Sequence, residues 1–401
     1  MTRSQDIARR IAYWRRKRGM TVRHFADLVG RSQSWAEKIE SGQREVVRLP
    51  MLERVAEVLQ VNVTTLISDA ATEAEAKPGA VEVSAIKSAL GSYGVLFADA
   101  GPPVDVESLK RRIEYANTAF LASDFATVGR MLPSLITDAQ KALGYGGGAG
   151  REAAALAVMV YKIASSTLHK FGSHEIAWLA ADRAMSAASQ AGDPVSLARG
   201  TRCAARALMS VGQRKEAVEL VNTAFGQLEP DLATASPELL ALVGMMLLAA
   251  EIAAAREGDA ETCMDMHERA ATLAARLGDD YDHPLTAFGM PNVEAHRLAS
   301  LVRLGNGPLA VAYAEQVSDE HLNRLPRERK ANYLLDLAEA HRQCGQPTPA
   351  VKALVLADLT SPQEVRRRPL GRDLIAALLA EEETSRSVSL RQVAVRAGLV
   401  A

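Results

Sequence analysis

Aromatic residues and cysteines are scarce in this chain. Phe, Trp and Tyr make up 4% of its 401 residues, although 48% of the residues are hydrophobic. Because strands favour aromatic and β-branched side chains, an alanine-rich composition with few rings predicts close-packed helices and few or no strands. The three cysteines, Cys203, Cys263 and Cys344, are far apart and odd in number, so they match no metal-site spacing. We therefore expect a reducing, cytoplasmic setting, no metal and no cofactor.

Long apolar runs and catalytic motifs are missing as well. The longest apolar run, 239–250, stops at Glu251 and is too short to span a bilayer, so it predicts a buried helix and no membrane partner. The N-terminus does not have the pattern of a signal peptide. His169 and His174 lack the spacing and the glutamate of a zinc protease, and the glycine run after Tyr145 lacks the lysine of a phosphate-binding loop. These absences predict a protein that is not an enzyme.

The most informative segment is residues 19–42, which predicts two short helices joined by a turn. Thr21 and Ser32 have hydroxyl groups that cap helix N-termini, and Gly30 and Gly42 suit the left-handed conformation that ends a helix. The predicted buried stripe of the first helix is Val22, Phe25, Ala26, Leu28 and Val29. In the second helix Ala36 and Ile39 face inward, and the outward residues are Gln33, Ser34, Glu37 and Lys38. The pair predicts a helix-turn-helix, whose second helix enters the major groove of DNA.

Apolar periodicity on both sides of this pair predicts a five-helix domain. The preceding helix buries Ile7, Ile11 and Trp14 and stops at Gly19. The following helix opens at Pro50, a residue that suits the first helical turn. Its predicted core residues are Leu52, Val55, Ala56 and Leu59, and the residues that close the core are Val63, Leu66 and Ile67.

The order of these helices and the segment GRSQSWAEKIESGQR resemble the phage-repressor-like XRE helix-turn-helix family. The resemblance implies that Gln33, Ser34 and Glu37 touch base edges of double-stranded DNA. It also implies that the loop after the helix, with Gln43 and Arg44, grips phosphate. We include Ser32, Lys38 and Arg23 as secondary contacts. Gln33→Ala should then relax sequence preference, whereas Arg44→Ala should weaken binding to all DNA alike.

Other positions of the same resemblance imply structural roles. Val22 stands where the family often has a glutamine that meets a phosphate, so Arg23 and His24 are the substitute donors. Glu40 should pair with Arg15 and brace the fold. Trp35 either packs on the first helix or touches a thymine methyl group.

Charge divides the chain in the same place. Residues 1–69 contain 13 Lys and Arg against 8 Asp and Glu, whereas the rest contains 34 against 40. A basic head suits the phosphate backbone, and the run from Arg15 to Arg18 is well placed for contacts that give affinity without sequence information. Residues 70–80 are acidic, rich in small residues and broken by Pro78 and Gly79, which predicts a linker. The expected domains are therefore 1–69 and 81–401.

The larger domain repeats one design. Six segments show a helix end, a glycine or short polar turn and an alanine-bearing second helix, beginning at Ser123, Phe171, Val211, Glu257, Leu304 and Cys344. They resemble degenerate tetratricopeptide units with longer loops or helices. Such units stack into an α-solenoid with a concave inner surface. A plain helical bundle is the alternative.

A DNA-binding head followed by such a body resembles the RRNPP group of peptide-sensing regulators. That resemblance implies a homodimer, an inverted-repeat DNA site and a groove that holds a signalling peptide. The candidate ligand residues are Tyr281, Phe288, Asn292, His296, Asn332, Tyr333 and Asp336, which are polar or aromatic in an alanine-rich body. Alternatively, the asparagines satisfy internal hydrogen bonds and the rings fill gaps between helices.

Other functions stay open for the larger domain. It can sense a small molecule, or it can dock a partner protein, such as an antitoxin-like or anti-regulator protein, without a diffusible ligand. A peptide groove should be lined by amides, a small-molecule site should be a closed pocket, and a docking surface should be a broad exposed apolar patch.

Overall fold

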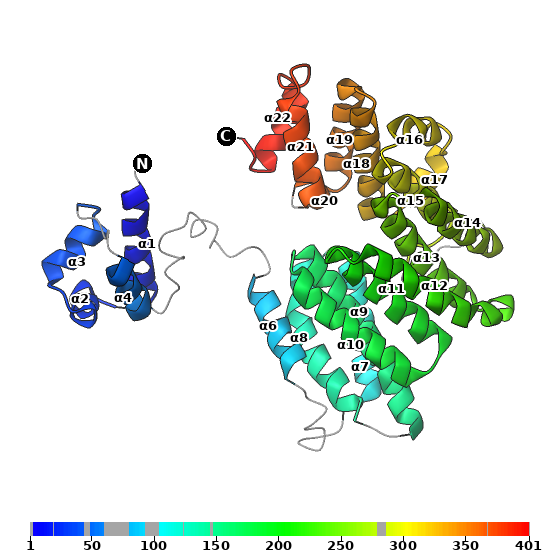
Figure 1. Ribbon diagram of the computed structural model, residues 1–401. Helices are drawn as coiled ribbons and strands as arrows, with labels where there is room; N and C mark the ends of the chain where they lie inside the picture. Colours follow the sequence, from blue (N-terminus) through cyan, green and yellow to red (C-terminus); the bar gives the residue numbers. More distant parts are fainter. Residues whose placement is uncertain are drawn as a thin grey trace. The chain divides into compact units, whose positions relative to one another are not determined.

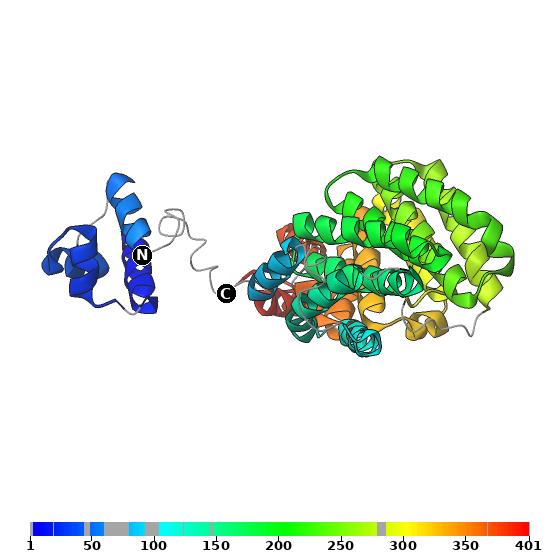
Figure 2. The same cartoon turned by 90° about the horizontal axis from the view of Figure 1, so that it is seen from below.

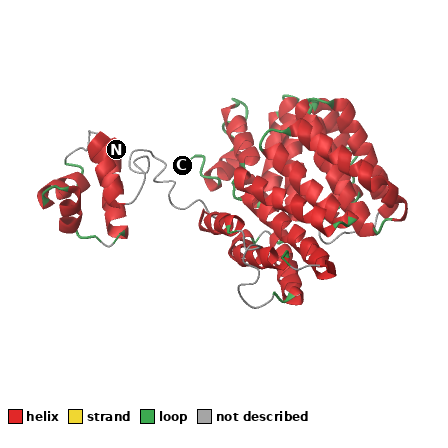
Figure 3. Cartoon of the chain, turned by 60° about the horizontal axis from the view of Figure 1, so that its bottom comes forward, coloured by secondary structure: helices red, strands yellow, loops and turns green. Residues whose placement is uncertain are grey.

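The computed structural model describes residues 3–18, 20–43, 49–59, 80–92, 104–122, 124–144, 147–278, 286–366 and 368–400. Within these ranges every regular element is a helix and none is a strand (Figures 1 and 3). The chain divides into two compact units, Met1–Val81 and Glu82–Ala401. The all-helical fold predicted from the scarcity of aromatics is confirmed.

The N-terminal unit contains a helix-turn-helix. Its described helices are α1 (Arg3–Lys17), α2 (Val22–Val29), α3 (Gln33–Glu40) and α4 (Leu49–Leu59). Its fully buried core consists of Ile11, Phe25, Ala26, Val29, Ala36, Ile39, Val55, Ala56 and Leu59. The side chains predicted to close the core, Val63, Leu66 and Ile67, lie outside the described residues, as do residues 70–79 of the predicted linker.

Four local signals set the ends of α2 and α3 as predicted. The Thr21 hydroxyl accepts a hydrogen bond from the His24 amide at 3.2 Å, and the Ser32 hydroxyl accepts one from the Trp35 amide at 3.2 Å. Gly30 and Gly42 have φ angles of 75° and 73°, a left-handed conformation in which a Cβ atom is unfavourable. The turn between the helices is therefore fixed by residues in and beside it.

One predicted core residue of α2 is on the surface. Leu28 is 41% exposed, whereas Phe25 and Ala26 are fully buried. At about 100° per residue, Leu28 lies roughly 60° beyond Phe25, outside the stripe that Phe25, Val29 and Ala26 form. The buried stripe of α2 is narrower than the apolar composition of the helix indicates.

The larger unit is a stack of helical hairpins (Figure 1). It opens with α6 (Ala80–Gly91), and six hairpins follow: α7 (Val106–Leu121) with α8 (Phe125–Ala142), α9 (Gly147–Lys170) with α10 (His174–Ala191), α11 (Pro194–Ser210) with α12 (Arg214–Leu228), α13 (Pro237–Glu257) with α14 (Ala260–Leu277), α15 (Met290–Arg303) with α16 (Gly307–Ala314), and α18 (Arg327–Gln343) with α19 (Pro347–Thr360). The unit closes with α20 (Pro362–Arg366), α21 (Pro369–Ala380) and α22 (Val388–Arg396). The six predicted helix–turn–helix joints are all present.

Five of these joints turn at a left-handed glycine. Their φ angles lie between 65° and 88°, and the residues are Gly172, Gly212, Gly258, Gly305 and Gly345. The repeats are longer than tetratricopeptide units partly because short helices are inserted between hairpins, namely η3 (Glu229–Thr234) and α17 (Asp319–Arg324).

The hairpins form two layers. First helices of neighbouring hairpins contact one another, in the order α9, α11, α13, α15 and α18, and each second helix packs on the first helix of its own hairpin. Successive hairpins follow an arc from α7 to α19 (Figures 1 and 2). Small side chains permit this close packing, since α10 buries seven alanines and no larger residue. The layer of first helices is therefore the framework on which a ligand site can be built.

The apolar run at 239–250 lies in α13, which extends from Pro237 to Glu257. Among the described residues, α13 is the helix that is long enough and apolar enough to cross a membrane. However, 89% of its most apolar stretch is buried inside the unit. The sequence predicted a buried helix here. The helix packs so tightly that a Cβ atom on Gly244 would lie 2.0 Å from Cζ of Phe288.

Candidate functional site

The outer face of α3 has the side chains predicted to read DNA. Gln33, Ser34, Glu37 and Lys38 are all exposed, while Ala36 and Ile39 on the opposite face are buried in the core. This division follows from helical periodicity, since Ala36 and Ile39 are three residues apart and share the inward face. The core makes no use of the four outward side chains.

Two of these side chains are joined to each other. The Gln33 Nε2 group donates a hydrogen bond to Glu37 Oε1 at 2.9 Å, across one helical turn. The bond uses one N–H of the Gln33 amide, whose carbonyl oxygen and second N–H make no hydrogen bond with another described residue. Adenine presents one donor and one acceptor in the major groove, and a glutamine amide matches that pair. The Gln33 amide is therefore held beside Glu37 on the exposed face of α3.

An ion pair fixes α3 against α1. Arg15 Nη2 lies 2.9 Å from Glu40 Oε2, and Arg15 Nη1 donates to the Met20 carbonyl at 2.6 Å. The predicted structural pairing of Arg15 with Glu40 is confirmed. Arg18 also bonds within the unit, through Nε to the Leu59 carbonyl at 3.1 Å. These two arginines of the basic run hold the fold together.

Trp35 is partly buried against the hydrophobic core of the unit. That position agrees with the packing role that the sequence left open for this ring, which is the alternative to contact with a thymine methyl group.

Several predicted secondary contacts surround α3. Arg23 and Gln43 are exposed, and Ser32 is exposed although its oxygen caps α3. Arg44 lies outside the described residues. Arg31 is a further exposed cation, in the turn directly before the α3 N-terminus, where a helix favours anions. The sequence signal for Arg31 is its place between the turn glycine and the capping serine.

The candidate ligand residues of α15 lie inside the unit. Asn292 is 1% exposed, and its side-chain nitrogen donates to the Met245 sulfur at 3.1 Å, while its Oδ1 atom has no hydrogen-bond partner in the described part of the chain. His296 is partly buried, and its Nδ1 lies 2.8 Å from the Asn292 carbonyl oxygen. Burial and the charge of Arg329 lower the pKa of His296 to about 3, so the ring is neutral at pH 7.

The candidates on α18 also make internal contacts. Asn332 accepts a hydrogen bond from Arg368 at 2.9 Å, and Asp336 forms an ion pair with Arg303 at 3.0 Å. Tyr333 is 2% exposed. These are the internal roles that the sequence left open for such residues.

Of the remaining two candidates, one is buried in the core and the other lies outside the described residues. Phe288 is 1% exposed and packs against Gly244 in the core. Tyr281 lies outside the described residues.

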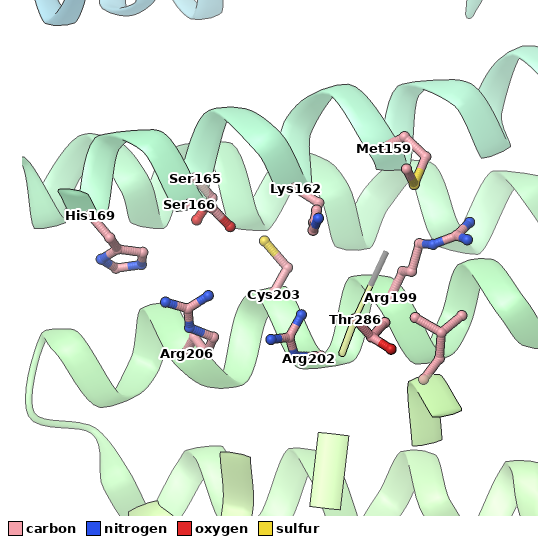
Figure 4. A pocket seen from close by; sticks show the side chains of 11 residues that line it. Met159, Lys162, Ser165, Ser166, His169, Arg199, Arg202, Cys203, Arg206 and Thr286 are labelled. Carbon is pink, nitrogen blue, oxygen red and sulfur yellow. The ribbon is translucent and has the colours of Figure 1, made fainter. Parts of the chain in front are cut away.

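A pocket that sequence reasoning missed lies between α9 and α11. Figure 4 shows side chains of α9 facing those of α11 across a gap. The lining residues are Met159, Lys162, Ser165, Ser166, His169, Arg199, Arg202, Cys203, Arg206, Leu242 and Thr286. Four are basic, and none of the described residues that line it is an Asp or a Glu. We call this site the basic pocket.

The basic side chains of the pocket weaken one another's charged states. Burial and the charges of Arg202 and Arg199 lower the pKa of Lys162 to about 7. Burial and the charge of Arg206 lower the pKa of Arg202 to about 9. Burial and the same arginine lower the pKa of His169 to about 3, so this ring is uncharged at neutral pH. Burial and mutual repulsion therefore disfavour the protonated forms of these side chains.

The signal for this pocket is present in the sequence. Arg199, Arg202 and Arg206 are three and four residues apart, so they share one face of α11. The acidic balance of residues 70–401 conceals this local cluster.

Comparison with known proteins agrees with the geometry of the N-terminal unit. A family model described as "Helix-turn-helix domain" matches residues 6–66. No curated protein matches the chain. Among solved structures, the chain is similar to Bacillus thuringiensis PlcR, crystallised in complex with the peptide PapR7 and DNA, with 15% identity, a TM-score of 0.33 and coverage of 68% of this chain and 95% of that one. This likeness is too distant to carry an argument. The similarity to the helix-turn-helix domain family covers residues 6–66, which include α2 and α3.

Proposed function

We propose that the chain is a sequence-specific transcription regulator whose N-terminal unit reads operator DNA and whose helical-repeat unit senses a ligand. The observation that carries the proposal is the outer face of α3, where four polar side chains are exposed and serve no packing purpose. In this proposal the DNA-binding domain is 1–69, a linker is 70–80 and the sensor and dimerisation domain is 81–401. The protein acts in the cytoplasm and is not an enzyme.

The proposal gives the DNA contacts two kinds of role. Gln33, Ser34 and Glu37 read base edges, where a well-formed contact discriminates by ~1–3 kcal/mol per base pair. Arg23, Ser32, Lys38, Gln43 and Arg44 contact phosphate and set affinity. Arg31 joins this second group because it is exposed beside the α3 N-terminus.

The proposed assembly on DNA is a homodimer. Two identical helix-turn-helix heads bind half-sites about one helical turn apart, roughly 34 Å, and the two-fold symmetry of the dimer favours an inverted repeat.

Partner docking without a diffusible ligand is the second candidate function of the larger unit. It is favoured by apolar side chains exposed on its last helices, among them Leu359 at 72% and Val388 at 70%. Exposed apolar groups of this kind also suit the dimer contact of the first proposal.

Selection of DNA from a random pool by the full-length protein tests the proposed function. The expected product is an inverted repeat. Gln33→Ala should relax the selected sequence at one position of each half-site, while Arg23→Ala should lower affinity for selected and random DNA equally. Adding small-molecule extract should change recovery if a ligand is sensed, whereas indifference to extract would favour docking. Recovery of no motif would contradict the DNA-reading role.

A further inference from the structure

We propose that the basic pocket binds a small organic anion through its phosphate or carboxylate groups, with Arg202 and Arg206 as the principal contacts. The inference rests on the proposed function, because it names the chemical class of ligand that the helical-repeat unit senses. None of the described ligand residues predicted from the sequence lines this pocket.

The first support is that two of the four cations form no ion pair among the described residues. Arg199 forms an ion pair with Glu238, and the Lys162 ammonium group donates to Asn117 Oδ1 at 3.2 Å. Arg202 and Arg206 form no ion pair within the described part of the chain, and Nε of Arg202 is buried there without a hydrogen-bond partner. Like charges held together away from water raise the free energy of the fold, and a bound anion relieves this cost.

The nearby carboxylates are already engaged elsewhere. Glu328, on α18, acts on Arg202 and Arg206 through space, but its Oε1 lies 2.8 Å from Lys170 Nζ. Glu364 is 2.7 Å from the same ammonium group and 2.7 Å from Arg368. Glu328 and Glu364 therefore form their ion pairs with cations that do not line the pocket.

The chemistry of the lining indicates what the anion looks like. Guanidinium groups offer paired N–H donors that match the oxygens of a phosphate or a carboxylate. Met159 and Leu242 contribute apolar surface to the same pocket. A compound with an anionic head and a small apolar portion is complementary to this arrangement.

The size of the pocket restricts the ligand. The empty space between the lining side chains is about 470 Å³ including open solvent, but the enclosed cavity is only about 20 Å³, room for roughly one water molecule. A ligand therefore has to displace the long side chains of Lys162 and the arginines, which have the rotatable bonds to move aside. This limits the ligand to a small molecule or the end of a chain.

Isothermal titration of the full-length protein with sodium pyrophosphate and with citrate tests the inference, at constant ionic strength and with chloride as the comparison anion. We expect at least one of the two to bind. The double variant Arg202→Gln/Arg206→Gln should bind it at least about 100-fold more weakly, since a hydrogen bond to a charged group contributes a factor of about ten or more. Arg151→Gln, which changes an exposed arginine of α9 that does not line the pocket, should bind as the wild type does.

Two further measurements make the result decisive. Arg206→Lys retains the charge but not the paired donors, so it should weaken binding by a smaller factor than the double variant. This single variant keeps the test informative if the double variant folds poorly. Binding of pyrophosphate alone identifies a phosphate ligand, and binding of citrate alone identifies a carboxylate ligand. No binding by either anion, or equal binding by the double variant, would overturn the inference. If the double variant still selects the operator sequence, that failure concerns the ligand class and leaves the DNA-reading function intact.

Discussion

Lys162 places an ammonium group beside three arginines, and its protonation should control both stability and anion binding. The groups that face it are Arg199, Arg202, Arg206 and the Cys203 thiol from α11, and Asn117 from α7. Burial and these cations hold its pKa at about 7, against 10.5 for an ordinary lysine. Between those two values the unfolded chain binds more protons than the folded chain, so the stability of the protein should rise with pH in that window.

Lys162→Met removes this charge and should stabilise the ligand-free protein. We expect roughly 1–4 kcal/mol at pH 6, by analogy with buried charges replaced by apolar groups. The gain should shrink as the pH rises from about 7 toward 10, because Lys162 of the folded wild type is then neutral. Urea unfolding at pH 6 and pH 9 measures both values.

The matched control is Lys87→Met, which changes an exposed lysine of α6 and should alter stability by less than about 0.5 kcal/mol. A loss of stability in Lys162→Met at both pH values would show that its hydrogen bond to Asn117 outweighs the repulsion.

Residue-level prediction from the sequence succeeded where periodicity decides the outcome. Ala36 and Ile39 are buried and Gln33 is exposed because a helix with one apolar stripe has one way to dock on a core. The candidate ligand residues were chosen for polarity and aromaticity alone. Those criteria do not distinguish Asn292, which is buried against Met245, from a groove residue, since burial depends on neighbours distant in sequence.

At the scale of single elements, α3 combines structural and functional demands at its first turn. The Ser32 hydroxyl caps the helix, and the same side chain is exposed where the proposal places a phosphate. The two roles make different demands, because the cap needs only an oxygen acceptor, whereas phosphate contact tolerates no negative charge.

Ser32→Ala and Ser32→Asp should separate these roles. The alanine variant loses the cap and should destabilise α3 by about 1 kcal/mol, visible as faster hydrogen exchange of the Trp35 amide. The aspartate variant keeps an acceptor, so exchange should stay close to that of the wild type. Its added negative charge should weaken binding to selected and random DNA alike, measured by fluorescence anisotropy. Unchanged DNA affinity in Ser32→Asp would place the phosphate away from this turn.

Element boundaries in the larger unit were predictable where a glycine marks them. The turns at Gly172, Gly212 and Gly258 require a left-handed residue, so composition and conformation agree there. The inserted helices η3 and α17 could not be predicted, because they are short and their sequences have no apolar repeat long enough to define a face.

At the scale of the whole helical-repeat unit, one lysine joins hairpins that are distant in sequence. Lys170, at the end of α9, lies 2.8 Å from Glu328 on α18 and 2.7 Å from Glu364 on α20. The Lys170 side chain therefore connects the second hairpin with the sixth. The Lys170 side chain is 13% exposed and that of Glu364 only 4%, so water screens this contact weakly.

Lys170→Met should break this long-range connection and lower the stability of the unit by about 3 kcal/mol, since it leaves two partly buried carboxylates without that partner. Urea unfolding at pH 7 measures the change. Lys215→Met, which changes an exposed lysine of α12, is the control and should have an effect below about 0.5 kcal/mol. An effect of the same size in both variants would mean that the connection is not a stabilising one.

The same variant should also alter the response to acid. Burial opposes the ionised form of Glu328, but the charges of Arg329, Lys170 and Arg368 outweigh it and hold the pKa below its usual value. A carboxylate with a lowered pKa stabilises the fold above its unfolded pKa, near 4.5, and this contribution disappears as the pH falls further. Removing Lys170 removes part of that contribution, so the stability of the variant should fall less steeply below pH 4.5 than that of the wild type.

Lys170→Met should also change the anion affinity of the basic pocket, although Lys170 does not line it. The Glu328 carboxylate and a bound anion would both attract Arg202 and Arg206, so a change at the partner of Glu328 should alter how strongly the anion binds.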